Sequence, residues 1–175
     1  PAFLSQVGIP IYSPSNYAEL RHWLPILLSD EVQGPRAIRY PRGGESAVLA
    51  RFGCSGNAYD RLYTTPDAKV VMVSYADEVE DVLTAAKRLG EENIACDVYK
   101  LVKIYPFTPE FVSCGGIGEH LEIALRKAGW QGTYIHRGVE EVRLPHATVP
   151  QIKQSTGLDA EHLAQTIRTW KGAES

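Results

Sequence analysis

The sequence lacks the features that mark membrane-spanning, secreted and zinc-binding proteins. It has no apolar run near the roughly 18 residues that a transmembrane helix needs, and no segment with the charged-then-apolar pattern of a signal peptide. Cysteine is scarce and odd in number, with three widely spaced residues, Cys54, Cys96 and Cys114. There is no Cys-x-x-Cys pair and no pair of histidines four residues apart, so nothing indicates a zinc site. We expect reduced thiols and a cytoplasmic protein.

An excess of positive charge is also lacking. The chain has 18 Lys and Arg against 21 Asp and Glu, a net charge of −3, with no basic stripe. Nucleic acid and anionic membranes are therefore poor candidate partners. The composition is that of a globular protein, 44% hydrophobic and 22% charged, which allows a sizeable core. The chain begins at Pro1 rather than Met, so we expect a fragment or a processed product.

The first forty residues predict a strand, a helix and a second strand. The first strand is the apolar run Ile9–Tyr12. Asn16, with Glu19 three residues later, forms a capping box that opens a helix with apolar residues at helical spacing. Pro25 interrupts the pattern and should kink or split that helix. Residues 37–40 then alternate as a short strand.

A change of pattern near residue 46 predicts a domain boundary. Residues 46–68 are rich in Gly with little periodicity, which indicates a linker. Beyond it, residues 69–75 form a β-branched strand, and Val79–Leu89 carries a helical apolar stripe closed by Gly90. A further strand over residues 94–101 completes a βαβ unit, which implies a parallel pair.

The last third of the sequence extends the α/β pattern. Gly115-Gly-Ile-Gly118 opens a helix that Gly129 stops, residues 133–136 read as a third strand, and Asp159 or a neighbouring residue caps a final helix. A Gly-Gly-x-Gly helix start normally follows a strand, yet the preceding stretch has two prolines and no room for one. We therefore expect a segment to be missing at Ser113–Cys114, either deleted or left out.

Arg39-Tyr-Pro-Arg-Gly43 is the sharpest candidate for chemistry. It lies where a strand ends, the usual place for ligands in open α/β sheets. An arginine suits phosphate because its planar fork donates parallel charge-assisted hydrogen bonds. On composition alone, pairing with a surface carboxylate is the more frequent outcome for an arginine. For Gly115–Gly118, tight helix packing is favoured over anion binding. No catalytic residue and no metal-ligand set is indicated.

Two strings resemble the 1-deoxy-D-xylulose-5-phosphate synthases, a family of transketolase-like thiamine-diphosphate enzymes. Tyr12-Ser-Pro-Ser-Asn-Tyr-Ala-Glu-Leu20 and Gly34-Pro-Arg-Ala-Ile-Arg-Tyr-Pro-Arg-Gly43 look like the end of their pyrimidine-binding domain. Lys69–Tyr75, Val79–Leu89, Gly115–His120 and Gly157–Glu161 resemble the transketolase C-terminal domain. The implied fold is a three-layer α/β domain with a mainly parallel sheet at residues 69–175. It is preceded by the end of an α/β pyrimidine-binding domain at 1–45 and a linker at 46–68.

The resemblance implies a function. These enzymes condense pyruvate with glyceraldehyde 3-phosphate, with loss of carbon dioxide, using thiamine diphosphate and Mg²⁺. The product, 1-deoxy-D-xylulose 5-phosphate, serves isoprenoid, thiamine and pyridoxal biosynthesis. The second arginine of the family's motif contacts the aldehyde's phosphate, and that position is Arg42. Arg39 and Tyr40 are carried only as neighbours that shape the strand end. The family also implies a cytoplasmic homodimer.

The sequence departs from the family in what it omits. The diphosphate- and metal-binding Gly-Asp-Gly motif, the cofactor-activating glutamate and the active-site histidines have no counterpart in it. We therefore expect the chain alone to be inactive and to need a missing N-terminal thiamine-diphosphate-binding region. The alternatives are another thiamine-diphosphate enzyme, either a transketolase or a 2-oxoacid dehydrogenase β subunit, or a non-catalytic assembly module of the same fold.

Overall fold

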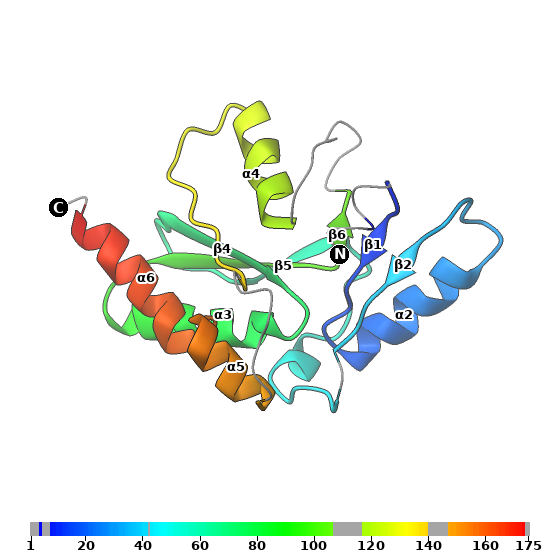
Figure 1. Cartoon of the computed structure of the whole chain (residues 1–175), viewed down its shortest axis with the longest axis horizontal. Coiled ribbons are helices and arrows are strands. Elements are labelled where there is room, and N and C mark those ends of the chain that lie inside the picture. The colour runs from blue at the N-terminus through cyan, green and yellow to red at the C-terminus, as the bar shows by residue number, and fades with distance from the viewer. Residues whose placement is uncertain (1–3, 5–7, 42, 107–116, 140–146, 174–175) are drawn as a thin grey trace. The chain divides into compact units, whose positions relative to one another are not determined.

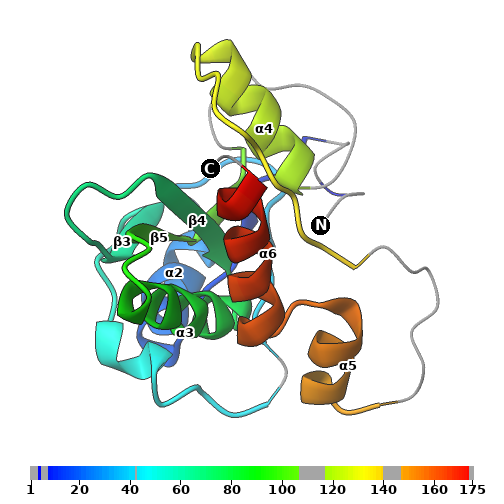
Figure 2. The same cartoon turned by 90° about the vertical axis from the view of Figure 1, so that its left-hand side faces the viewer.

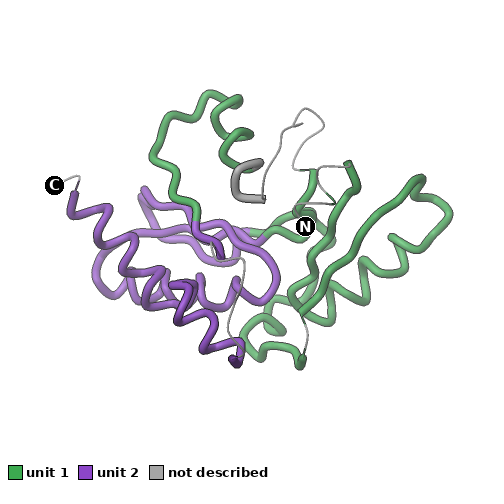
Figure 3. The backbone as a smooth tube through the Cα atoms, viewed as in Figure 1, with its two compact units in different colours: residues 1–60, 101–136 green, residues 61–100, 137–175 purple. Residues whose placement is uncertain are grey.

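The computed structural model of the protein describes residues 4, 8–41, 43–106, 117–139 and 147–173. The chain divides into two compact units (Figure 3). Unit 1 comprises residues 1–60 and 101–136, and unit 2 comprises residues 61–100 and 137–175. Each unit therefore takes its residues from two separate stretches of the sequence. The domain boundaries expected from the sequence stay a prediction.

Unit 1 contains a small mixed sheet of three strands. Its strands β1 (Ile11–Tyr12), β2 (Ala37–Ile38) and β6 (Lys103–Tyr105) lie in the order β2-β1-β6. β1 and β2 are parallel, whereas β1 and β6 are antiparallel. The antiparallel partner comes from the second half of the chain, more than 90 residues after β1 in sequence order. No local pattern in the first forty residues could reveal that pairing.

The helix predicted after Asn16 is confirmed as α2 (Tyr17–Leu28). The Asn16 side chain accepts a hydrogen bond from the Glu19 backbone N–H at 2.8 Å, as an N-cap does. The Glu19 carboxylate accepts from the N–H and the hydroxyl of Ser15, the residue before the N-cap. Of the two outcomes predicted at Pro25, a kink or a split, the split does not occur. Helix α2 continues through Pro25, since proline removes one intrahelical hydrogen bond and the remaining turns persist.

The predicted linker contains regular structure. A 3-10 helix, η1 (Leu49–Phe52), and a strand, β3 (Tyr59–Tyr63), lie within residues 46–68. Gly53 and Gly56, both with positive φ, separate them. Strand β3 was not predicted, because its Tyr-Asp-Arg-Leu-Tyr pattern is short and follows a Gly-rich stretch.

The predicted βαβ elements of unit 2 are confirmed. They are β4 (Val70–Tyr75), α3 (Glu78–Glu91) and β5 (Cys96–Leu101), and the two strands are neighbours in a sheet of order β3-β5-β4. Helix α3 packs against β4, and α6 (Ala160–Ala173) packs against α3 (Figures 1 and 2). The buried side chains of this core are Val70, Met72, Val79, Val82, Leu83, Ala85, Ala86, Leu89, Cys96, Val98 and Ala164.

The prediction that Gly90 ends α3 is wrong. The helix runs through it to Glu91, and Asn93 supplies a left-handed backbone with φ of 60°. A Cβ atom on Gly90 would lie 2.9 Å from the Tyr63 hydroxyl oxygen, closer than side chains pack. Gly90 therefore leaves room for the Tyr63 hydroxyl and does not terminate the helix.

Gly90→Ala should consequently depend on Tyr63. Alanine gains about 1 kcal/mol over glycine in a helix interior, but here its methyl group meets the Tyr63 hydroxyl. We expect Gly90→Ala to be neutral or destabilising in the wild type and stabilising by up to about 1 kcal/mol beside Tyr63→Phe. Urea unfolding of the four proteins measures this. Equal effects of Gly90→Ala in both backgrounds would contradict the packing argument.

The remaining helices have recognisable ends. Helix α4 (Ile117–Lys127) is followed by Gly129 with φ of 86°, as predicted. Asp159 caps α6 as predicted, accepting from the N–H groups of Glu161 and His162. Helix α5 (Val149–Thr156) was not predicted, although Thr148, Gln151 and Gly157 mark its two ends. No helix in the described ranges has the length and apolar character to cross a membrane.

The strand predicted at residues 133–136 is wrong. This stretch is irregular, and most of its side chains are exposed. Tyr134 packs edge-on against Trp130, whose ring also lies under the Arg126 guanidinium at 5.0 Å. A strand requires a partner for its backbone groups, and this stretch is paired with none of the described strands.

Candidate functional site

The candidate site lies where β1 and β2 end, beside the first turn of α2. Because β1 and β2 are parallel, their carboxyl ends meet at one edge of the sheet. The Arg39 backbone N–H donates to the Tyr12 carbonyl at 2.9 Å, which extends the ladder by one residue beyond β2. Tyr40 follows with 62% of its surface exposed. Arg42 itself lies outside the described residues.

Glu45 connects the segment after Arg42 to helix α2. Its carboxylate oxygen Oε1 accepts a hydrogen bond from the Tyr17 backbone N–H at 2.5 Å. Tyr17 is the first residue of α2, where the N–H groups carry the positive end of the helix dipole. Gly43, with φ of 126°, lies between Arg42 and this contact. The chain is thus anchored three residues before Arg42, at Arg39, and three residues after it.

Asn16 anchors the next part of the same segment. It is buried, and its Nδ2 donates to the Leu49 carbonyl at 3.1 Å and the Gly53 carbonyl at 2.8 Å. These carbonyls flank η1, so one side chain both caps α2 and holds this short helix against it. The sequence pattern predicts Asn16 as a cap but not its bonds to the Leu49 and Gly53 carbonyls, because these bonds join residues 33 and 37 positions apart.

The Arg36 side chain has a structural role. Its guanidinium donates to the carbonyls of Leu27 and Ser29 at the end of α2 and to those of Val32 and Gly34 in the turn after it. The carbonyls at the end of a helix lack intrahelical donors. Arg36, the arginine of the resemblance string that precedes Arg39, therefore stabilises the turn between α2 and β2.

Polar groups are buried at the start of α2. Ser13, Ser15, Asn16 and Glu19 are all almost fully buried. Within the described part of the chain, the Ser13 hydroxyl is buried without a hydrogen-bond partner, as is the indole N–H of Trp23. Trp23 stacks on Tyr12 with ring centroids 5.0 Å apart, and burial raises the pKa of the Tyr12 hydroxyl. This end of the sheet is thus polar, packed and anchored by several side chains.

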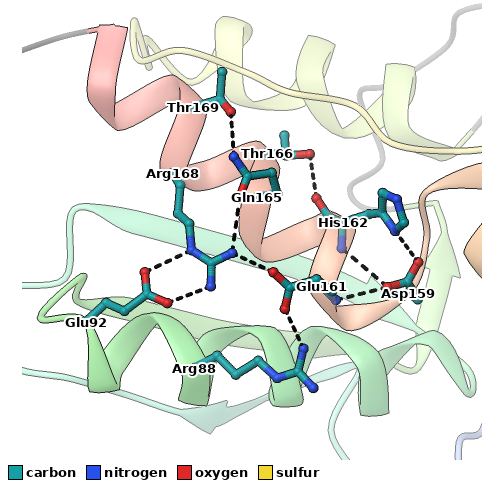
Figure 4. A network of polar contacts seen from close by, with 9 residues as sticks. All are labelled: Arg88, Glu92, Asp159, Glu161, His162, Gln165, Thr166, Arg168 and Thr169. Carbon is teal, nitrogen blue, oxygen red and sulfur yellow. Dashed lines mark hydrogen bonds and ion pairs between the residues drawn. The ribbon is translucent and has the colours of Figure 1, made fainter.

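The charged side chains of unit 2 form a network between helices (Figure 4). Arg168 of α6 donates two hydrogen bonds to the Glu92 carboxylate, at 2.9 and 2.6 Å, and one to Glu161 at 2.8 Å. Arg88 of α3 donates to Glu161 at 2.7 Å. These hydrogen bonds to Arg168 lower the pKa of both carboxylates. The network joins α3 to α6, and its carboxylates are occupied by arginines, so we assign it to stability.

The network predicts a pH-dependent effect of Arg168→Met. Both carboxylates have a folded-state pKa below their ordinary 4.5, so their contribution is present above that pH and is lost as the pH falls through the lowered pKa values. We expect Arg168→Met to lower the thermal midpoint at pH 7, and 1 M NaCl should reduce the difference. Below pH 4 the difference should shrink further. Lys87→Met, at an exposed cation on α3, is the control. A difference that persisted unchanged at pH 3 would contradict the assignment.

The remaining sequence candidates receive no structural support as a site. Gly115 and Gly116 lie outside the described residues, as do the side chains of residues 117–120. His162 lies 2.5 Å from Asp159, on the exposed first turn of α6. Among the residues that the structure describes, no three His, Cys, Asp or Glu side chains are grouped as a metal site would require.

Known proteins resemble this chain in sequence and in fold. No family model matches it. It is 27% identical to the 1-deoxy-D-xylulose-5-phosphate synthase of Thermotoga sp. strain RQ2 over 198 aligned positions, covering 98% of this chain and 30% of that protein. The synthase of Mycobacteroides abscessus is also 27% identical, over 96% of this chain and 29% of its own length. The chain therefore spans about 30% of the length of these relatives.

Solved structures show the same fold. A split-gene transketolase, described as an inactive β4 tetramer, superposes with a TM-score of 0.71 at 18% identity, over 96% of this chain and 60% of that one. The transketolase of Campylobacter jejuni superposes with a TM-score of 0.58 at 15% identity, over 93% and 26%. The chain thus has the α/β fold of part of a transketolase and distant sequence similarity to the C-terminal portion of 1-deoxy-D-xylulose-5-phosphate synthases.

Proposed function

We propose that the chain is the C-terminal portion of a 1-deoxy-D-xylulose-5-phosphate synthase, a transferase that condenses pyruvate and glyceraldehyde 3-phosphate with decarboxylation. The observation that carries the proposal is the sequence similarity to these synthases along 98% of the chain. The Arg39-Tyr-Pro-Arg-Gly43 motif supports it, because the motif directly follows β2 at the carboxyl edge of the sheet. The product would feed the isoprenoid, thiamine and pyridoxal routes.

The chain's own contribution to catalysis, in this proposal, is to bind the phosphate of the aldehyde substrate. Arg42 is the residue that would do so, through its planar, permanently charged guanidinium. Arg39 and Tyr40 would shape the strand end beside it. The anchoring of Arg39 to Tyr12 and of Glu45 to Tyr17 supports this role, since a bound phosphate needs an arginine held at a defined place.

Thiamine diphosphate and Mg²⁺ would be held by another region of the enzyme. The described residues of this chain offer no group of acidic or His and Cys side chains for a metal, and the sequence has no Gly-Asp-Gly motif. The described residues therefore do not fit the cofactor, and we assign none of them a step in its chemistry. We propose that the N-terminal thiamine-diphosphate-binding region is the obligatory partner.

Exposed apolar side chains on α2 support such an assembly. Tyr17, Leu24 and Leu28 are 47%, 36% and 72% exposed, and their spacings of seven and four residues place them on one side of the helix. We propose that residues 1–45 complete a pyrimidine-binding domain with the missing region. We further propose that residues 69–175 form the C-terminal domain of a cytoplasmic homodimer, with 46–68 between the two. Ser113 and Cys114 lie outside the described residues, so the segment expected between them stays a prediction. The alignment with the Thermotoga sp. synthase is 198 positions long, longer than the 175 residues of this chain, so it contains gaps in this chain.

A second candidate function is that of a transketolase. The observation in its favour is that the solved structures on which the chain superposes, at TM-scores of 0.71 and 0.58, are transketolases. The two candidates differ in their donor substrate, pyruvate against a ketose phosphate. A 2-oxoacid dehydrogenase β subunit and a non-catalytic assembly module share the fold, but no observation on this chain favours either.

Reconstitution tests the proposed division of labour. The chain is assayed alone and after being joined to the N-terminal region of its parent protein, with pyruvate, glyceraldehyde 3-phosphate, thiamine diphosphate and Mg²⁺. We expect no product from the chain alone and 1-deoxy-D-xylulose 5-phosphate from the joined protein. Product from the chain alone would contradict the assignment of the cofactor to another region. A joined protein that binds the cofactor but forms no product would favour the assembly module.

A further inference from the structure

We propose that strand β4 is an interaction surface through which two copies of this chain pair edge to edge. This pairing goes beyond the proposed function, because it assigns the contact surface of a dimer and does not depend on enzymatic activity. Strand β4 lies at one end of the sheet order β3-β5-β4, so its outer side pairs with no strand in the described part of the chain (Figure 2). The backbone N–H and C=O groups along an outer side can bind another strand.

The other outer strands of the two described sheets have features that block pairing. Strand β3, at the opposite end of the same sheet, contains the charged residues Asp60 and Arg61. Strand β2 has only two residues, and β6 has three, begins with Lys103 and is followed by Pro106. Charge, proline and short length are the means by which proteins protect sheet edges. Strand β4 has six residues, Val-Val-Met-Val-Ser-Tyr, with no charge, proline or glycine, so it is the unprotected outer strand of these two sheets.

The two faces of β4 differ in exposure. Val70 and Met72 are buried, and helix α3 packs against the strand. Val71 and Val73, which alternate with them and so point to the opposite face, are 58% and 36% exposed. When a second strand pairs with the edge, β-branched side chains at such positions gain cross-strand contacts and lose contact with water. Strand β4 therefore offers both a backbone edge and apolar side chains that pairing would cover.

The charges at the two ends of β4 favour a second copy of the same strand as its partner. The exposed Lys69 precedes β4, whereas the acidic Asp77 and Glu78 follow it at the start of α3. Two copies related by a twofold axis run antiparallel, which brings the Lys69 end of each strand beside the acidic end of the other. The strand itself is uncharged, so no like charges meet at the axis. The edge is thus complementary to itself.

Pairing through β4 forms a closed dimer and not a filament. The two three-stranded sheets join along β4, and the combined sheet then ends in β3 on both sides. Because β3 carries Asp60 and Arg61, these ends are protected against further pairing. The contact is one strand wide, smaller than the roughly 800 Å² per partner of a stable interface, so we expect a dissociation constant on the order of 10 µM.

Sedimentation velocity of the isolated chain between about 1 and 200 µM tests the pairing. We expect a monomer at the lowest concentration and a dimer at the highest. Val71→Lys places a charge beside the edge at an exposed position and should weaken dimerisation by at least about tenfold. Leu28→Lys, at an apolar side chain of α2 that is 72% exposed, is the matched control and should leave the dimer unchanged. Thermal unfolding shows whether both variants fold.

Hydrogen exchange of the wild-type chain locates the contact without any variant. The peptide that spans β4 should contain amides that exchange about fivefold more slowly at 200 µM than at 1 µM, because pairing occupies the amides on the outer side of the strand. The peptides that span β3 and α2 should exchange at the same rate at both concentrations. Equal exchange of the β4 peptide at the two concentrations would overturn the inference.

The sedimentation results can contradict the pairing in three ways. A chain that stays monomeric at the highest concentration has no such contact. A dimer that a folded Val71→Lys leaves intact is formed by another surface, and loss of the dimer in Leu28→Lys would place that surface on α2. Large aggregates without a defined dimer would contradict the closed arrangement. None of these results concerns catalysis, so this inference and the proposed function can fail separately.

Discussion

Replacing Arg42 by alanine is expected to raise KM for glyceraldehyde 3-phosphate by about 10²-fold and to leave KM for pyruvate nearly unchanged. A hydrogen bond to a charged group contributes about 1.5–3 kcal/mol, and 1.4 kcal/mol corresponds to a factor of ten. The loss should be confined to the phosphorylated aldehyde, since the phosphate is the only group that the guanidinium is proposed to contact. Steady-state kinetics of the assembled enzyme with both substrates varied measures it.

Two further variants sharpen the test of Arg42. Arg42→Lys keeps the positive charge but loses the planar fork, so it should recover part of the affinity and not all of it. Arg21→Ala removes an exposed arginine of α2 in the same unit and should have no effect on either KM. If Arg42→Ala weakened an unphosphorylated aldehyde as much as the phosphorylated one, the phosphate-binding role would be excluded.

Asn16→Ala is expected to lower the free energy of unfolding by about 2–4 kcal/mol. The variant loses the N-cap of α2, which contributes about 1 kcal/mol, and it loses two hydrogen bonds to the carbonyls of Leu49 and Gly53. The Leu49 bond is buried, so its carbonyl would be left without that donor away from water. Urea unfolding of the chain measures the change.

Asn16→Ser divides that cost into its two parts. Serine keeps an oxygen that can cap α2 but cannot donate to two carbonyls on η1 at once. We expect Asn16→Ser to lose about 1–3 kcal/mol, less than Asn16→Ala but well above zero. If serine restored full stability, the bonds to Leu49 and Gly53 would contribute nothing, and the docking of η1 on α2 would need another cause.

The parts of the fold that were predicted from the sequence depend on local signals. Asn16 and Asp159 begin helices because their side chains accept from N–H groups two or three residues away. Gly129 ends α4 because its left-handed backbone is readily available to glycine. Each of these signals involves residues within one turn of each other, so no knowledge of distant partners was needed.

The failures have the opposite character. Gly90 resembles a helix stop, but its small size accommodates Tyr63, which is 27 residues earlier in the sequence. The strand expected at residues 133–136 has the composition of a strand but lies beside no described strand that could pair with it. Strand β6 pairs with β1, which lies more than 90 residues earlier in the sequence. In each case tertiary contacts, and not local preference, decided the outcome.

The residues of the candidate site also differ in whether a local sequence signal or a distant contact identifies them. Arg42 could be named from its motif, because the resemblance involves consecutive residues. Glu45 and the second role of Asn16 could not be named, since their partners are 28, 33 and 37 residues away and no spacing rule connects them. The proposed phosphate-binding residue is thus readable from the sequence, whereas the contacts of Glu45 and Asn16 required the structure.

The most direct test of the account is a comparison of donor and acceptor substrates in the assembled enzyme. Pyruvate with glyceraldehyde 3-phosphate is compared with a ketose phosphate donor and an aldose phosphate acceptor, the substrates of a transketolase. The account predicts that 1-deoxy-D-xylulose 5-phosphate forms from the first pair, with little turnover of the second. Efficient transfer from the ketose phosphate, with no product from pyruvate, would contradict it and assign the chain to a transketolase.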